Sequence, residues 1–231
     1  MAARLRYELR DSLATIALDD GKVNALSLGM IEEIGAALDR AEKDAAAVVL
    51  LGRAGVFSAG FDLVTIRGGG TDAPRMLIGG FELAARMYAF PQPIVAACSG
   101  HALAMGAFLL LACDYRVGAE GAFRIAANEV SIGLTMPHFA IEICRARLTP
   151  ACFQRAMLHS EIFGPHAARE AGFLDQLVAP AELEEQARAA AARIAALPRA
   201  TYTATKLRVR EAALVAMRRG IAQDAQGFGP T

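Results

Sequence analysis

Two short, continuously apolar segments, each followed by a turn that contains glycine, limit most strongly what this chain can fold into. AVVLLGR (residues 47–53) and PIVAACSG (93–100) lack the polar–apolar alternation of a half-exposed strand. Strands of this kind are buried on both faces, as in a parallel sheet covered by helices. Apolar residues at helical spacing follow in segments 75–90 and 102–113. We therefore predict an α/β fold with βαβ units and a mostly parallel sheet.

The flanking segments complete this plan. YELRDSLATIAL (7–18) predicts a hairpin around Arg10, Asp11 and Ser12, and a helix follows over residues 27–44 with Ser27 as its N-cap. Residues 65–74 predict a flexible connection, and residues 128–137 an irregular one. Two short strands are expected within residues 115–126. Beyond Pro137 the chain is predicted to be almost entirely helical, with helices over 181–197 and 206–221.

The last residues, RRGIAQDAQGFGPT (218–231), are shorter and more polar than a full terminal helix requires. We therefore expect either a curtailed last helix or a tail that folds differently. The domain division expected from sequence is a core over residues 1–196 and a helical tail over 197–231.

Composition excludes several classes of protein. The chain has 231 residues, 55% of them hydrophobic, with 24 Lys and Arg against 24 Asp and Glu. This balance does not favour a nucleic-acid or acidic-membrane partner. The apolar runs fall short of the roughly 20 residues that span a bilayer, and the start, MAARLRYELRDSL, lacks the apolar core of a secretory signal. The cysteines have no CxxC spacing, which predicts buried thiols, no metal site and a cytoplasmic location; they are Cys98, Cys113, Cys144 and Cys152.

Two strand-to-helix junctions are the candidate site. In FSAGFDL (57–63), Gly60 can adopt a backbone conformation that aims the Phe61 amide into a cleft. In GHALAMG (100–106), free amides at a helix start, including that of Met105, attract negative charge. Two converging amides could hold the oxygen of an acyl carbonyl as it becomes an enolate. Glycine placement alone equally fits two ordinary turns between strand and helix.

These segments carry a family resemblance. FSAGFDL, PIVAACSGHALAMGAFLLLACDYRV and NEVSIGL, in this order, resemble the crotonase superfamily of enoyl-CoA hydratases and isomerases. VNALSLGM (23–30) resembles the early substrate-side segment of that family, and AAREAGFLDQLV (167–178) resembles a later one. The resemblance covers residues from about 5 to 200.

The resemblance implies a ClpP/crotonase-like α/β fold, which is a spiral of repeated ββα units followed by C-terminal helices that form trimers or dimers of trimers. It implies an acyl-CoA thioester substrate and no cofactor beyond the coenzyme A that the substrate carries. The implied oxyanion-hole donors are the amides of Phe61 and Met105. The implied substrate-binding residues are Ala25, Leu26, Ser58, Gly60, Phe61, Asp62, Leu63, Met105 and Phe108.

One of two expected acids is missing. Enoyl-CoA hydratases resemble one another in two glutamates; Phe108 stands at the first position, whereas Glu129 retains the second. Hydration uses two carboxylates well, but one base suffices to move a double bond from the 3,4 to the 2,3 position. The Asn128–Glu129 pair and the large apolar Phe61 resemble the Δ3,Δ2-enoyl-CoA isomerase branch. We therefore expect Glu129 to be a single proton shuttle, with a pKa raised by Phe61, Met105, Phe108 and Ile132.

Several alternatives stay open. The same pocket could serve a weak hydratase, thioester hydrolysis or decarboxylation, or it could bind acyl-CoA without turnover. A hydrolytic triad is disfavoured because neither Ser58 nor Ser99 has a His/Asp partner in sequence order.

Further polar residues are candidates for the site or its surroundings. His101 could contact substrate but is more often structural, and His138 alters the pocket floor. Glu142 is expected to be solvated beside Arg145. Asp62 and Asp114 are expected to hold backbone turns or helix starts. Candidate contacts for the coenzyme A phosphates, with a solvated helix face as the favoured alternative, are Lys22, Arg67, Lys206, Arg208 and Arg210. Members of the family often have a lysine shortly after the segment that FSAGFDL resembles, and this chain has Val64 there.

Overall fold

A computed structural model describes residues 3–227. The strands are β1 (Leu5–Arg10), β2 (Leu13–Leu18), β3 (Ala47–Leu51), β4 (Gly55–Ser58), β5 (Ile94–Cys98), β6 (Gly100–Leu103), β7 (Tyr115–Ala119), β8 (Ile125–Ala126) and β9 (Gln176–Val178). The helices are α1 (Leu28–Lys43), α2 (Leu63–Gly68), α3 (Asp72–Ala89), α4 (Met105–Ala112), α5 (His138–Arg147), α6 (Pro150–His159), α7 (Pro165–Ala171), α8 (Leu183–Ala195) and α9 (Arg199–Gly227), with short 3-10 turns η1 (Val130–Ile132) and η2 (Pro180–Glu182).

Two sheets organise the fold. The larger has the order β1-β2-β3-β5-β7-β9, and the smaller has the order β4-β6-β8. β1 and β2 form the predicted antiparallel hairpin, whose turn residues Asp11 and Ser12 have φ values of 48° and 59°. The other neighbouring strands in both sheets pair in parallel. Consecutive strands such as β3 and β4 therefore alternate between the sheets, which gives the predicted spiral of ββα units.

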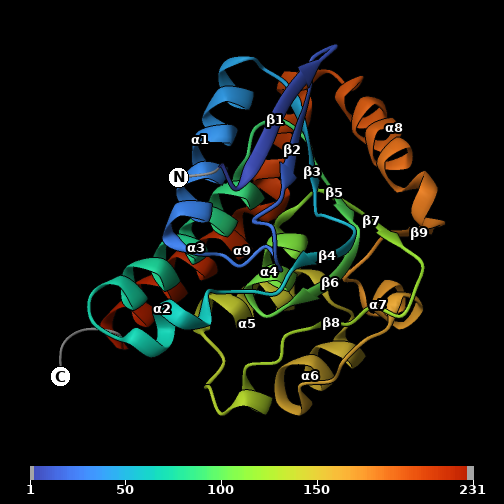
Figure 1. Ribbon diagram of the computed structural model, residues 1–231. Helices are drawn as coiled ribbons and strands as arrows, with labels where there is room; N and C mark the ends of the chain where they lie inside the picture. Colours follow the sequence, from blue (N-terminus) through green and yellow to red (C-terminus); the bar gives the residue numbers. More distant parts are fainter. Residues whose placement is uncertain (1–2, 228–231) are drawn as a thin grey trace.

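Helices cover both faces of the larger sheet. On one face, α8 places Leu183, Ala187 and Ala191 against Val95 and its neighbours in β3, β5 and β7. Figure 1 shows α8 on one side of this sheet and α1, α3 and α9 on the other. The apolar β3 and β5 segments are consequently buried on both faces, as the sequence predicts.

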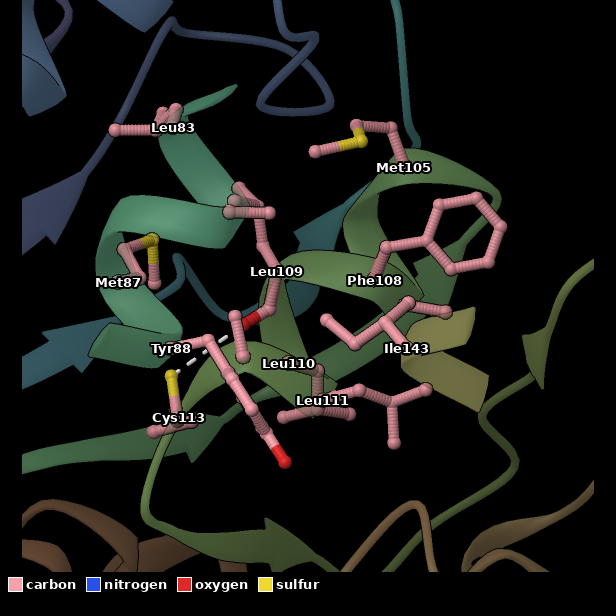
Figure 2. Packing of buried hydrophobic residues seen from close by; sticks show 14 of the residues in the cluster. Leu83, Met87, Tyr88, Met105, Phe108, Leu109, Leu110, Leu111, Cys113 and Ile143 are labelled. Carbon is pink, nitrogen blue, oxygen red and sulfur yellow. Dashed lines mark hydrogen bonds between the residues drawn. The ribbon is translucent and has the colours of Figure 1, made fainter. Parts of the chain in front are cut away.

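α4 lies at the centre of the larger core, and every one of its residues is buried. Figure 2 shows Leu109 extending toward Leu83, Met87 and Tyr88 of α3, whereas Phe108 extends in the opposite direction, beside Ile143 of α5. An all-apolar helix of this kind fits only where protein surrounds it. This packing fixes where the first residue of α4, Met105, can lie.

Four sequence expectations require correction. Residues 100–103 form β6, so the helix expected from residue 102 begins at Met105. The connection over residues 65–74 is largely helical, because α2 occupies Leu63–Gly68 and α3 starts at Asp72. β9 interrupts the helical region beyond Pro137 by adding an edge strand to the larger sheet. The polar end is not curtailed, since α9 continues to Gly227; residues 228–231 lie outside the described residues.

α9 packs across α3 and α5. Gly220 is required for this approach, because a Cβ there would lie 2.9 Å from the backbone nitrogen of Phe139. One turn further, the Asp224 carboxylate accepts hydrogen bonds from the amides of His138 (2.9 Å) and Phe139 (3.0 Å). It caps α5, whose own N-cap residue, Pro137, makes no side-chain capping bond. The predicted boundary between the core (1–196) and the helical tail (197–231) lies between α8 and α9, and this domain division stays a prediction.

Candidate active site

The first glycine turn follows β4 and is fixed by short hydrogen bonds. Gly60 has a φ of 92°, in the region that favours glycine. Ser58 is fully buried; its hydroxyl donates to Asn24 O (2.8 Å) and accepts from Gly60 N (3.2 Å). Leu26 and Phe61 form a parallel β-bridge: the Leu26 amide donates to Gly60 O, and the Asp62 amide donates to Leu26 O. The Phe61 amide is left facing the other side of the segment.

The second turn joins β6 to α4. Ala104 has φ 49° and ψ −124°, and Met105 is the first residue of the helix. The first amides of a helix have no acceptor within the helix. Within residues 3–227, neither the Phe61 amide nor the Met105 amide donates a recorded hydrogen bond. Both predicted donors therefore lack an acceptor within the described residues.

The two turns touch. A Cβ built on Gly60 would lie 2.9 Å from Leu103 O, 3.1 Å from Ala104 Cβ and 3.4 Å from Met105 N. A Cβ on Gly106 would lie 2.4 Å from Ser58 O, so β4 and the start of α4 are also in close contact. The structure thus brings together two turns that are more than forty residues apart in the sequence.

Glu129 approaches this region from the end of β8. The amide of Ala104 donates to Ala126 O (2.8 Å), and Glu129 follows Ala126 by three residues. Its side chain is buried, with the residue 7% exposed, and its Oε2 has no hydrogen-bond partner within the described residues. Burial raises the pKa of Glu129 from an ordinary 4.5 to about 7. Such a carboxyl group can both take up and release a proton near neutral pH.

Aromatic side chains close one side of the site. The Phe61 ring is partly buried and meets Phe81 edge to face at 5.8 Å, and Phe81 stacks on Phe139 at 5.1 Å. Phe108 and Phe139 are essentially unexposed core residues. Phe61 therefore keeps exposed surface, whereas the other rings of this series belong to the core. Ile132, expected to shield Glu129, is instead 53% exposed.

The other site residues predicted from the sequence either stabilise the local backbone or are partly exposed to solvent. Asp62 caps α2, as expected, by accepting from the amides of Val64 and Thr65. Leu63 is 51% exposed and Ala25 is half-buried, so both lie at the rim of the first turn. His101 Nδ1 accepts from the Arg124 amide (3.0 Å), which fits its structural alternative.

Two candidates for the coenzyme A phosphates are internal. Lys206 Nζ lies 2.8 Å from Asp114 Oδ2, and Arg210 lies 2.9 Å from Asp114 Oδ1, with all three side chains less than 10% exposed. Lys206 and Arg210 are therefore neither free to contact the coenzyme A phosphates nor part of a solvated helix face, and both expectations are corrected. Asp114 also accepts from the Ile94 amide and is architectural, as expected. The exposed candidates are Lys22, Arg67 and Arg208.

The other considered side chains are engaged in the scaffold. Glu142 pairs with Arg145 at 3.5 Å. The backbone amide of His138 is held by Asp224, as described above. Ser99 donates to Arg53 O. Cys98, Cys113 and Cys144 are buried as predicted, whereas Cys152 is half-buried.

Sequence reasoning missed residues that position the turns. Asn24 is fully buried, and its side-chain amide donates to Leu18 O and Phe57 O. Its place in the VNALSLGM segment was the available signal. Ala104 could not be identified from the sequence, because an alanine residue does not indicate a positive φ.

Cavities of 670 and 470 Å³ lie along α3, the first bounded by α9 and the second by α1, and neither is lined by Glu129 or the two turns. Residues 3–227 contain no cluster of three or more His, Cys, Asp or Glu side chains suited to a metal ion. Over the same residues, no helix has the length and apolarity that crossing a membrane requires.

Comparison with known proteins agrees with this geometry. The sequence profile named enoyl-CoA hydratase/isomerase matches residues 8–231. An enoyl-CoA hydratase/isomerase family protein from Pseudomonas syringae superposes with a TM-score of 0.95 at 43% identity, covering 98% of both chains. An enoyl-CoA isomerase from Mycobacterium tuberculosis gives 0.94 at 44% identity, covering 98% of this chain and 99% of that one.

A probable enoyl-CoA hydratase from Rhodobacter capsulatus is 33% identical over 204 residues, which cover 87% of this chain and 79% of the relative. The names of the relatives thus divide between the two reactions. The chain belongs to the enoyl-CoA hydratase/isomerase family of the crotonase superfamily.

Proposed function

We propose that this protein isomerises 3-enoyl-CoA thioesters to 2-enoyl-CoA, with Glu129 as the single proton shuttle and the amides of Phe61 and Met105 as the oxyanion hole. One observation carries the proposal: Glu129 is a buried carboxylate with an unpartnered oxygen and a pKa of about 7. The position of a second acid is occupied by Phe108, which is 1% exposed.

The isomerisation needs only the Glu129 carboxylate and the amides of Phe61 and Met105. The Glu129 carboxylate removes a proton from C2 of the substrate, and the C–H electron pair moves toward the thioester carbonyl. The resulting dienolate oxygen accepts hydrogen bonds from the two free amides. Protonated Glu129 returns the proton to C4, and the double bond ends between C2 and C3. A pKa near 7 suits this cycle because neither protonation state is strongly disfavoured.

The matched hydratase favours a second candidate, the addition of water to a 2-enoyl-CoA. That reaction must activate a water molecule and deliver a proton, a task that two carboxylates share well. A phenylalanine at position 108 can do neither. We therefore rank hydration below isomerisation for this chain.

The test is turnover of a trans-3-enoyl-CoA, followed by absorbance of the conjugated product, beside hydration of crotonyl-CoA. Glu129→Gln removes the base and is expected to lower the isomerase kcat by roughly 10²–10⁴-fold. For the native protein, kcat/KM should rise with pH through about 7, because the ionised carboxylate is the base. Glu120→Gln, at an exposed glutamate after β7, is the matched control and should leave both rates unchanged.

Isomerase activity that survives Glu129→Gln contradicts the shuttle. Hydration without isomerisation favours the second candidate, and binding of both thioesters without turnover favours a non-catalytic acyl-CoA binder. The absence of a further cofactor and the assembly into trimers stay predictions from the resemblance. Sedimentation of a stable monomer would contradict the latter.

A further inference from the structure

Ala104 holds an unusual backbone conformation directly before Met105. Its φ of 49° and ψ of −124° lie near the first central position of a type II′ turn, where glycine dominates. A residue with a Cβ pays a conformational penalty there and keeps the conformation only when its surroundings over-determine it. Strain of this kind is concentrated at functional sites.

Hydrogen bonds hold Ala104 from both sides. Its amide donates to Ala126 O of β8 at 2.8 Å. Its carbonyl accepts from the amides of Ala107 (2.9 Å) and Phe108 (3.2 Å) in the first turn of α4. Ala104 is therefore fixed through its amide to the smaller sheet and through its carbonyl to the buried helix, and that carbonyl belongs to the same peptide group as the Met105 amide.

The methyl group of Ala104 adds a contact that glycine would lack. It lies 3.1 Å from the point that a Cβ on Gly60 would occupy, so it packs against the Gly60 backbone. Gly60 immediately precedes Phe61, the residue that carries the other free amide. The Ala104 methyl group, together with Leu103 O at 2.9 Å from the same point, thus limits how closely the two turns approach, and Ala104 is only half-buried.

We propose that Ala104 is a positioning residue, which fixes the distance and direction of the Met105 amide relative to the Phe61 amide. The inference rests on the oxyanion-hole part of the proposed function and deepens it. A glycine at position 104 would relax the backbone and remove the methyl contact, so the turn would be easier to form but less restricted.

The test compares Ala104→Gly with Ala45→Gly. Ala45 also has a positive φ (55°), but it is exposed at the end of α1, away from the site. Both substitutions remove a Cβ from a residue with positive φ and add similar flexibility to the unfolded chain. Each should leave Tm unchanged or raise it by about 2–4 °C.

Two readouts separate positioning from structure. Ala104→Gly should lower kcat for the 3-enoyl-CoA by about tenfold with a much smaller change in KM, which is less than the 10²–10³-fold lost when a whole donor is removed. It should also reduce the enolate absorbance of bound acetoacetyl-CoA, a probe that reports on the oxyanion hole without turnover. Ala45→Gly should change neither.

The outcomes are distinct. Unchanged kcat and unchanged enolate absorbance in Ala104→Gly overturn the inference. If the native protein shows the enolate band but does not isomerise, the proposed reaction fails while the band in Ala104→Gly still decides the role of Ala104. If the native protein binds acetoacetyl-CoA without an enolate band, the oxyanion hole and this inference fail together. A fall in Tm that matches the loss of activity assigns Ala104 a merely structural role.

Discussion

Asp114 and Glu129 are two carboxylates that the fold takes out of water: 6% of the Asp114 side chain is exposed, and 7% of the residue Glu129. Asp114 accepts from the Ile94 amide at 2.7 Å and is paired with Lys206 at 2.8 Å and Arg210 at 2.9 Å. Glu129 has no cation beside it that affects its pKa, and its Oε2 lacks any hydrogen-bond partner within residues 3–227.

The comparison shows how burial affects a carboxylate with and without neighbouring cations and hydrogen-bond donors that replace its water. At Asp114 two cations and an amide replace the lost water, so the charge can serve as a structural anchor for α9. At Glu129 only a hydrogen bond from its own backbone amide opposes the loss of water, so desolvation dominates and raises the pKa to about 7. A carboxylate withdrawn from water therefore becomes a paired anchor in one place and a group with a pKa near neutrality in the other.

Removing the charge at Asp114 should produce the largest loss of stability. Asp114→Asn leaves Lys206 and Arg210 buried without a counter-charge, and breaking such a buried pair typically costs about 3–5 kcal/mol. Urea unfolding measures the change. Glu184→Gln breaks the exposed pair between Glu184 and Arg188 and should cost less than about 0.5 kcal/mol. Equal effects of the two substitutions would show that the buried cluster is not an anchor.

The opposite sign is expected at Glu129. Its folded pKa lies above the ordinary value, so the folded state keeps a proton that the unfolded state releases, and stability falls as pH rises from about 4.5 to about 7. Glu129→Gln has no such proton to lose. At pH 8 the variant should be more stable than the native protein by up to about 3 kcal/mol, and near pH 4 the two should coincide.

Unfolding curves at several pH values check this expectation, with Glu120→Gln as the exposed control that should follow the native protein throughout. A Glu129→Gln variant that is less stable than the native protein at pH 8 would mean that the ionised carboxylate has a compensating partner.

A smaller loss is expected at Asp224, a third buried carboxylate, which caps α5 through the amides of His138 and Phe139. Asp224→Asn keeps one acceptor oxygen but removes the charge at the helix start, so it should cost about 1–2 kcal/mol. Thermal unfolding measures it. No change in Tm would show that the amides of α5 find water as an equal partner.

Local patterns predicted much of this structure. The hairpin, the doubly buried β3 and β5, and the Ser27 cap of α1 follow from residues close together in the sequence. Short strands such as β6 and β9 were missed because they form only when distant strands offer backbone partners. The internal roles of Lys206 and Arg210 were missed for the same reason, since their partner Asp114 is about ninety residues away.

The site divides in the same way. Glu129, Phe61 and Met105 could be chosen from motifs, but the contact between Gly60 and Ala104 depends on the pairing of β4 with β6 in the smaller sheet. The strain at Ala104 is a property of the folded backbone and has no counterpart in residue type.

The cap that Asp224 provides for α5 also sets an order of events during synthesis. Phe139 lies in the first turn of the helix that Asp224 caps, Phe139 stacks on Phe81, and Phe81 meets the Phe61 ring. While Asp224 is still inside the ribosome, the nascent chain lacks the group that caps α5 at the far end of this aromatic series. A ribosome-bound chain of that length already contains Glu129 and both glycine turns, but the cap of α5 can form only after Asp224 has emerged.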